Sequence, residues 1–152
     1  MSYVDRVLLP GEHVTARANI HWVIYLSGLL VMGLGAIIYI VALQEPLIAS
    51  ALDIVALVTV LFGSILILSA WFYRYGTEIT VTTHRAIYKS GILSRRTVEM
   101  NLDQVESVEV HQSILGRVLG YGDIAVHGTG EGIENISMVS DPLTVRSAIT
   151  AR

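Results

Sequence analysis

The chain contains no cysteine and few charged residues, and both shortages narrow what it can be. Without cysteine it forms no disulfide, carries no thiol nucleophile and binds no metal through thiolates. Only 15% of its 152 residues are charged whereas 53% are hydrophobic, which is too apolar for an ordinary soluble domain of this length. Charge is missing altogether from residues 22–43 and 54–73, which contain no Asp, Glu, Lys, Arg or His. The apolar excess therefore lies in two defined runs.

Each uncharged run is long enough to cross a membrane, since about 20 residues at about 1.5 Å each reach the roughly 30 Å of a hydrocarbon core. Two core helices of a soluble protein are the alternative, but the remaining residues are too few to cover them. A cleaved signal peptide is disfavoured because the first run starts late and lacks a small-x-small cleavage site. We predict a transmembrane hairpin of antiparallel helices, about 22–43 and 54–73, with an external loop over 44–53.

The distribution of basic residues predicts the orientation of this hairpin. None of the ten Lys and Arg residues lies in the 44–53 loop: two precede the first run, Arg74 directly follows the second, and seven more lie beyond it. Because basic flanks stay in the cytoplasm, both termini are predicted to be cytoplasmic. We expect a multi-pass protein of the bacterial inner membrane, with residues 1–21 as a partly extended cytoplasmic segment and residues 74–152 as a cytoplasmic domain.

Small residues recur at seven-residue intervals in both runs: Gly28, Gly35, Ala42, Ala56, Gly63 and Ala70. In an antiparallel hairpin centred on residue 49 they would meet as the pairs 28–70, 35–63 and 42–56. Small residues let membrane helices approach closely, so the pattern predicts a helix-packing seam. The alternative is chance, because Gly and Ala are common in such helices.

Beyond residue 74 the apolar and polar residues alternate, which is the pattern of strands. The alternation predicts five or six antiparallel strands, with a bulge near Glu106 and Ser107. Residues 13–20 alternate in the same way, and we expect them to pack near the domain as a strand or extended stretch.

Two helices are predicted within the same region. The segment from Ser113 to Gly120 fits a short helix with a serine cap and a glycine stop. Asp141 followed by Pro142 is a helix start, and the apolar residues after it form one stripe. The predicted fold class is therefore α+β: a transmembrane hairpin plus a small antiparallel β domain with a C-terminal helix.

Several motifs occur together along the chain: Leu9-Pro10-Gly11-Glu12, His21-Trp22, Thr82-Thr83-His84-Arg85-Ala86-Ile87-Tyr88, Gly91, Val105 and Gln112-Ser113-Ile114-Leu115-Gly116-Arg117-Val118-Leu119-Gly120-Tyr121-Gly122-Asp123-Ile124. In combination they resemble the bacterial PH-domain membrane proteins (YdbS-like) over nearly the whole chain. The resemblance implies a PH-like antiparallel β split barrel closed by the C-terminal helix, which agrees with the predicted order of elements. It brings no catalytic motif, and lipid head-group specificity does not follow from the fold alone.

No catalytic or metal-binding pattern is apparent in this sequence. The five histidines form neither an i, i+4 helical pair nor an HExxH motif. The glycine-rich stretches 116–122 and 128–132 lack the strand-then-helix context and the Lys-Ser/Thr ending of a phosphate loop, so we interpret them as turns. The net charge of −3 argues against nucleic acid. We expect no enzyme activity, no metal, no cofactor and no nucleic-acid partner.

Charge is unevenly distributed within the domain. Residues 74–96 hold five basic residues and one acidic residue, whereas residues 97–134 hold seven acidic residues and one basic residue. A basic residue near an anionic membrane surface contributes about 1 kcal/mol of attraction. The candidate residues for binding anionic lipid or a partner are Arg85, Lys89, Arg95 and Arg96. Ordinary surface and topology-determining charge is the alternative.

Three classes of function remain after these exclusions. The favoured hypothesis is a membrane-anchored PH-like interaction or scaffold module, which self-associates as a homo-oligomer or binds another membrane protein. The second is recognition of anionic lipid of the bilayer. The third, an accessory subunit of a transporter or membrane enzyme, is weakened because neither apolar run contains an ionisable residue.

Overall fold

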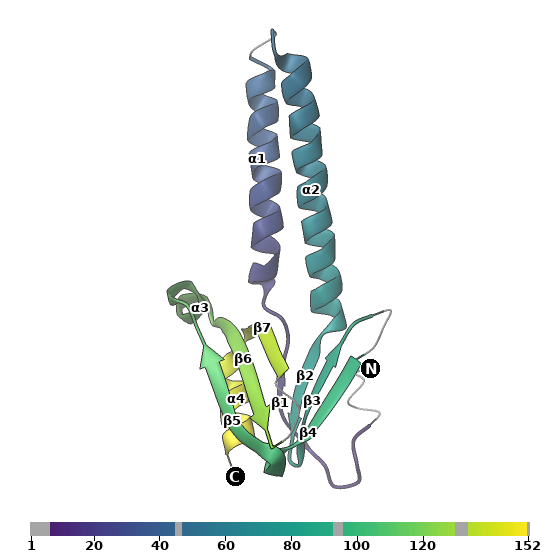
Figure 1. Ribbon diagram of the computed structural model, residues 1–152, viewed down its shortest axis with the longest axis vertical. Coiled ribbons are helices and arrows are strands. Elements are labelled where there is room, and N and C mark those ends of the chain that lie inside the picture. Colours follow the sequence, from purple (N-terminus) through teal and green to yellow (C-terminus); the bar gives the residue numbers. More distant parts are fainter. Residues whose placement is uncertain (1–6, 45–46, 93–95, 130–133, 152) are drawn as a thin grey trace. The chain divides into compact units, whose positions relative to one another are not determined.

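The computed structural model describes residues 7–44, 47–92, 96–129 and 134–151. The chain forms two units (Figure 1). One is the helical hairpin Trp22–Tyr73, and the other is a β-rich domain built from both ends of the chain, Met1–His21 and Arg74–Arg152. The segment before the hairpin, which we predicted as a separate stretch packing near the domain, is therefore part of the domain.

The helices of the hairpin are η2 (Trp22–Tyr25), which continues into α1 (Leu26–Ala42), and α2 (Ala49–Gly76). The second helix is longer than the predicted 54–73. The prediction left Asp53 outside the helix because of its charge, whereas the structure places it in the second turn of α2. Arg74 lies in the last turn, where a cation is favoured by the helix dipole. The connection between the helices is correspondingly shorter than the predicted loop.

Apolar side chains cover the surface of the hairpin. In their most apolar windows the two helices have mean hydropathies of 2.3 and 2.6, and only 17% and 11% of the window residues are buried. A core helix of a soluble protein would be mostly buried, with its apolar face turned inward. The hairpin thus consists of two helices that are long and apolar enough to cross a membrane and that expose their apolar side chains.

The small residues of the predicted seam are all buried within the hairpin: Gly28, Gly35, Ala42, Ala56, Gly63 and Ala70. A Cβ on Gly28 would lie 3.0 Å from the Ile67 nitrogen and 3.1 Å from the Gly63 oxygen. A Cβ on Gly35 would lie 3.1 Å from the Val60 nitrogen and 3.2 Å from the Ala56 oxygen. Each glycine therefore faces two residues one turn apart on the other helix.

This register differs from the predicted pairs 28–70 and 35–63 by roughly one to two helical turns. The predicted pairs assumed a turn centred on residue 49. Because α2 already begins at Ala49, the connection spans residues 43–48 and its centre lies near residue 46. The length of the connection determines which residues of the two helices face each other, and the seven-residue spacing of the small residues does not reveal this length.

The domain contains two antiparallel sheets, with strand orders β1-β2-β3-β4 and β5-β6-β7. The strands are β1 (Val14–Ala18), β2 (Glu78–Thr82), β3 (Arg85–Ser90), β4 (Arg96–Asn101), β5 (Val105–His111), β6 (Tyr121–Gly128) and β7 (Glu134–Ser140). β1 precedes the hairpin and pairs with β2, which follows it. The predicted bulge is confirmed, because the register of β5 against β6 shifts between Val105 and Ser107.

The helices of the domain are η3 (Leu102–Gln104), α3 (Ile114–Leu119) and α4 (Pro142–Thr150). α4 begins after Asp141 as predicted, but the Asp141 carboxylate accepts a hydrogen bond from the Thr144 hydroxyl at 2.6 Å and none from the helix backbone. Helix α4 packs on β1, β5 and β6, and its residues Val145 and Ile149 are buried.

The core of the domain lies between the two sheets and α4. Its most deeply buried apolar side chains come from both sides of the hairpin and include Ile20, Val81, Ile124, Val139 and Val145. The predicted α+β class is confirmed: two antiparallel sheets and a C-terminal helix form a PH-like domain that accompanies two long apolar helices (Figure 1).

Candidate functional site

The residues Leu9-Pro10-Gly11-Glu12 form a tight turn that folds a carboxylate back onto the chain. The Glu12 N–H donates to the Leu9 oxygen at 2.9 Å, and Gly11 has a φ of +87°. Proline followed by a residue of positive φ is typical of a type II turn, and glycine adopts this φ without steric cost. The Leu9 N–H donates in turn to Glu12 Oε2 at 2.9 Å. The turn therefore fixes the direction of the Glu12 side chain.

The Glu12 carboxylate meets Arg85 at the start of β3. Arg85 donates from Nε to Glu12 Oε1 and from Nη2 to Glu12 Oε2, each at 3.0 Å, and the Thr82 hydroxyl donates to Glu12 Oε1 at 2.7 Å. Arg85 also donates to the Val7 oxygen at 2.9 Å and to Glu99 on β4 at 2.6 Å. The Glu12 side chain is 1% exposed and that of Arg85 is 15% exposed. These bonds fasten the segment before β1 to the sheet.

The two charges stabilise each other inside the domain. The hydrogen bond from Arg85, followed by that from the Leu9 backbone, lowers the pKa of Glu12 from 4.5 to about 2 despite its burial. The hydrogen bond to Glu12 raises the pKa of Arg85 above its usual value. Both groups are therefore charged throughout the physiological pH range.

This geometry corrects the interpretation of Arg85 as part of a free basic surface. Its guanidinium is directed at Glu12, Glu99 and a backbone oxygen, so its charge is neutralised within the domain. The prediction grouped Arg85 with its basic neighbours because it counted charges within a short stretch of sequence, and Glu12 lies 73 residues away.

Neither Lys89 nor Arg96 is placed next to Arg85 in the sheet. Lys89 is four residues further along β3, about 13 Å away at about 3.3 Å per residue, and Glu78 is its direct partner on β2. Arg96 is exposed at the first position of β4, opposite Ser90. Arg95 lies outside the residues that the structure describes.

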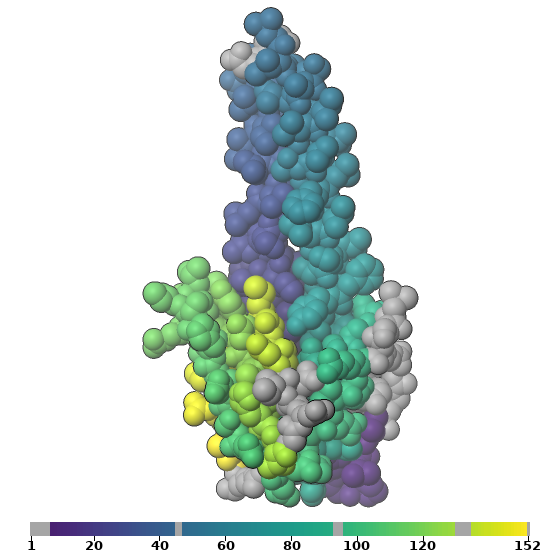
Figure 2. All heavy atoms as spheres, viewed as in Figure 1, coloured from purple at the N-terminus to yellow at the C-terminus, as the bar shows by residue number. Residues whose placement is uncertain are grey.

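Among the described residues of the domain, those of helix α3 include its most exposed aliphatic side chains. As predicted, the Ser113 hydroxyl accepts from the Gly116 N–H at 3.0 Å, and Gly120 ends the helix with a φ of +77°. The exposed fractions of its large aliphatic residues are 85% for Ile114, 66% for Leu115, 78% for Val118 and 41% for Leu119. Figure 2 shows this helix projecting from the domain.

The buried residue of α3 is a glycine, which explains why the aliphatic side chains face outward. A Cβ on Gly116 would lie 2.6 Å from the Tyr121 oxygen, so only glycine lets the helix sit this close to β6. Gln112 donates to the same oxygen at 3.0 Å. Sequence reasoning found the helix but not its exposed face, and the inward glycine among four large aliphatic residues is the signal that could have revealed it.

The end of the domain that carries α3 is also where the chain leaves for the hairpin. The ring of Tyr121, which directly follows the Gly120 cap, stacks on the ring of His21 with centroids 5.3 Å apart. His21 donates from its backbone to the Met138 oxygen at 2.7 Å, and the next residue is Trp22 of the hairpin. Burial, and to a smaller extent the charge of Arg74, lowers the pKa of His21.

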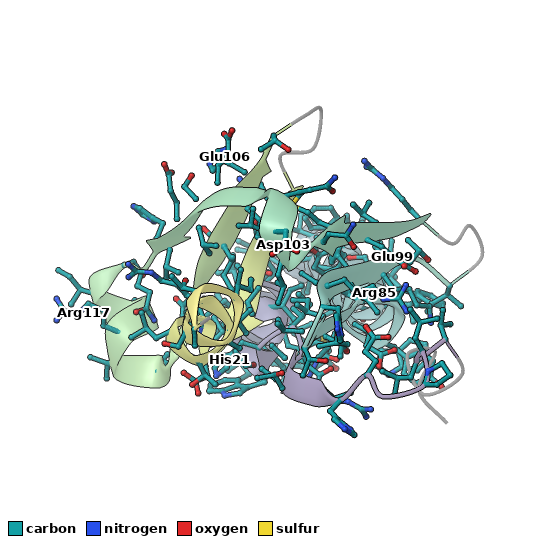
Figure 3. All side chains as sticks on the ribbon, turned by 90° about the horizontal axis from the view of Figure 1, so that it is seen from below. His21, Arg85, Glu99, Asp103, Glu106 and Arg117 are labelled. Carbon is teal, nitrogen blue, oxygen red and sulfur yellow. The ribbon has the colours of Figure 1, made fainter. Side chains whose placement is uncertain are left out.

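Acidic residues lie at the other end of the same sheet. Asp103 and Glu106 are exposed next to the start of β5, whereas α3 follows its end, roughly 20 Å further along at about 3.3 Å per residue. Arg117 of α3 points away from the rest of the domain and is well separated from both carboxylates in Figure 3. The end of sheet β5-β6-β7 near the start of β5 is therefore acidic, whereas the end near α3 combines the aliphatic residues and Arg117 of α3 with Asp123 of β6 and Asp141.

Within the described residues, no group of three or more His, Asp and Glu side chains is placed to hold a metal ion. His127 Nε2 lies 3.9 Å from Glu109 Oε1. The candidate functional features of the described residues are therefore three surfaces: the apolar surface of the hairpin, the edges of the sheets and the exposed face of α3.

Comparison with known proteins identifies one family. A family model described as bacterial PH domain matches residues 23–150, which is nearly the whole chain. The match is to the family as a whole and does not distinguish YdbS-like members. No curated protein matches. No solved structure matches either.

Proposed function

Because this chain belongs to the bacterial PH domain family, we propose that it is a membrane-anchored interaction module and not an enzyme. Its hairpin spans the bacterial inner membrane, both termini are cytoplasmic, and the domain binds a second copy of the chain or another membrane protein. The observation that carries this proposal is the almost wholly apolar, outward-facing surface of the hairpin, directly continuous in sequence with a small β domain.

The orientation is supported by the absence of Lys and Arg from the short connection between the helices, while basic residues flank both helices on the domain side. Trp22 and Trp71 lie near the domain ends of η2 and α2, where aromatic rings favour the membrane interface.

Two sheet edges supply a surface for a protein partner. Strands β4 and β5 are terminal in their sheets, so each has one hydrogen-bonded neighbour among the described strands. Such an edge accepts an added strand through main-chain hydrogen bonds. Exposed charges on both strands, such as Glu99 and Glu109, disfavour non-specific pairing with the edge strands of other proteins. A partner that pairs with these strands must therefore accommodate the charges.

Recognition of anionic lipid head groups by the four basic residues is less well supported. Arg85 is engaged with Glu12 and Glu99, and Lys89 lies opposite Glu78. A purely electrostatic lipid site would therefore have to rest on fewer residues than the sequence suggested.

Site-specific photocrosslinking in cells tests the interaction function. A photoreactive residue replaces exposed Thr97 on β4 or Ser107 on β5, and Arg146 on the exposed side of α4 serves as the matched control. We expect discrete adducts from position 97 or 107 and none from position 146. If neither edge forms an adduct and the protein is monomeric in mild detergent, the interaction module is contradicted.

A further inference from the structure

Helix α3 presents an apolar surface that the core of the domain does not use. All four of its large aliphatic residues are exposed, and the residue facing the domain is Gly116. The serine cap and the glycine stop hold the helix in place at both ends. A folded domain that holds aliphatic side chains outward in this way offers them for contact with an apolar partner.

The position of α3 favours the lipid bilayer as that partner. The Tyr121 ring that follows the helix stacks on His21, and one peptide bond separates His21 from the apolar helix that begins at Trp22. The burial of Ile20 and the hydrogen bond from Ser140 to Asn19 fix this last segment to the domain. The α3 end of the domain is therefore the end at which the chain passes into the first apolar helix.

The charge carried by the α3 segment itself fits the same partner. Between Gln112 and Gly122 the sequence contains one charged residue, Arg117, and its side chain points away from the domain (Figure 3). Aliphatic residues with a single long cation match the membrane interface, where the apolar part is buried and the guanidinium reaches the phosphates. The carboxylates of Asp103 and Glu106 lie near the start of β5, at the other end of the strand. The two carboxylates at the α3 end accept hydrogen bonds within the domain, Asp123 from the Met138 N–H at 2.9 Å and Asp141 from the Thr144 hydroxyl at 2.6 Å.

We propose that α3 is an interfacial anchor. It inserts Ile114, Leu115 and Val118 into the cytoplasmic leaflet and places Arg117 at the level of the lipid phosphates. This inference rests on the proposed membrane insertion and adds to it. The anchor fixes one end of the domain against the bilayer, which leaves the edges of β4 and β5 accessible to a protein partner.

The natural absence of cysteine makes a direct test possible. Single cysteines replace Leu115 in α3, Leu30 on the exposed face of α1 and Ser107 at the far end of the domain, and each carries an environment-sensitive fluorophore. The full chain is placed in nanodiscs of phosphatidylethanolamine and phosphatidylglycerol, with or without lipids that carry a quencher on the acyl chain. We expect the labels at positions 115 and 30 to lose fluorescence with the quencher lipid, and the label at position 107 to keep it.

The Leu30 label separates failure of the anchor from failure of the proposed function. If position 30 is quenched and position 115 is not, the hairpin is in the membrane and the anchor is overturned. If position 30 is not quenched, membrane insertion fails and the anchor fails with it. If position 115 is shielded from an aqueous quencher without being reached by the lipid quencher, a protein covers α3 and the bilayer is the wrong partner.

A variant distinguishes insertion from mere proximity. The label is moved to Ile114, and Leu115→Asp and Val118→Asp are introduced together, because both side chains are exposed and their replacement leaves the core untouched. Insertion predicts that lipid quenching at position 114 is lost in this variant and retained in its Leu115→Ala, Val118→Ala counterpart. Equal quenching in both would overturn the proposal.

Discussion

Glu12 and Arg85 lie 73 residues apart in the chain and form a two-point ion pair, with both nitrogen–oxygen distances at 3.0 Å. The pair joins a turn that precedes the hairpin to a strand that follows it. Because the domain is built from both sides of the hairpin, this contact helps to bring the two ends of the hairpin together in one fold. The two residues belong to motifs that the sequence offered separately, Leu-Pro-Gly-Glu and Thr-Thr-His-Arg.

Breaking this pair is expected to destabilise the domain strongly. Arg85→Ala leaves a buried carboxylate without its partner, which costs about 3–5 kcal/mol. Arg85→Lys should recover only part of this loss, since an ammonium cannot form two parallel bonds. Thermal unfolding in mild detergent measures the effect, with the exposed Arg146→Ala on α4 as the control. A melting temperature for Arg85→Ala equal to that of the control would refute the role assigned to the pair.

The same pair makes stability depend on acid. A carboxyl group whose pKa falls on folding stabilises the fold fully above its unfolded pKa, and this contribution is lost as pH falls through the folded value. For Glu12 these values are 4.5 and about 2, so a contribution of about 3 kcal/mol disappears across this interval. Melting curves between pH 6 and pH 2 should show a steeper loss for the native chain than for Glu12→Gln. Parallel curves would exclude Glu12 as the group responsible.

The glycines of the hairpin are expected to differ sharply in their tolerance of a methyl group. A Cβ on Gly28 would meet the backbone of α2, whereas on Gly33 it would meet no atom of the described residues within 4 Å. Gly28→Ala should cost about 1–3 kcal/mol by forcing the helices apart. Gly33→Ala should be neutral or stabilise by up to about 1 kcal/mol through helix propensity. Unfolding in detergent compares them, and equal stabilities would contradict the close packing.

Within α3 the same comparison tests which face is turned inward. Gly116→Ala places a methyl group against the Tyr121 oxygen and should cost about 1–3 kcal/mol. Leu115→Ala removes an exposed side chain and should change the stability of the detergent-solubilised protein by less than about 0.5 kcal/mol. The reverse order, with Leu115→Ala the more damaging, would mean that α3 packs its aliphatic face on the domain.

Much of the fold could be predicted from short-range sequence patterns. The uncharged runs marked both long helices, Ser113 and Gly120 bounded α3, and Asp141-Pro142 marked the start of α4. These features depend on residues a few positions apart, which a single sequence displays.

The features that could not be predicted depend on contacts between residues far apart in the chain and on the direction in which side chains point. The register of the hairpin follows from the length of its connection, so the pairing of Gly28 was misplaced although its burial was anticipated. Arg85 was interpreted as surface charge because its partner is far away in the chain. A six-residue helix is too short for its periodicity alone to show which side is buried, and the packing of Gly116 against β6 explains why the aliphatic residues of α3 are exposed.

The central claim is that the hairpin spans the membrane with the domain in the cytoplasm, and cysteine accessibility in intact bacteria tests it most directly. Leu47→Cys lies in the connection between the helices, and Thr129→Cys is an exposed position directly after β6. A maleimide that cannot cross the inner membrane should label position 47 in intact cells and position 129 only after lysis. Labelling of position 129 in intact cells, or of neither position until lysis, would contradict the account.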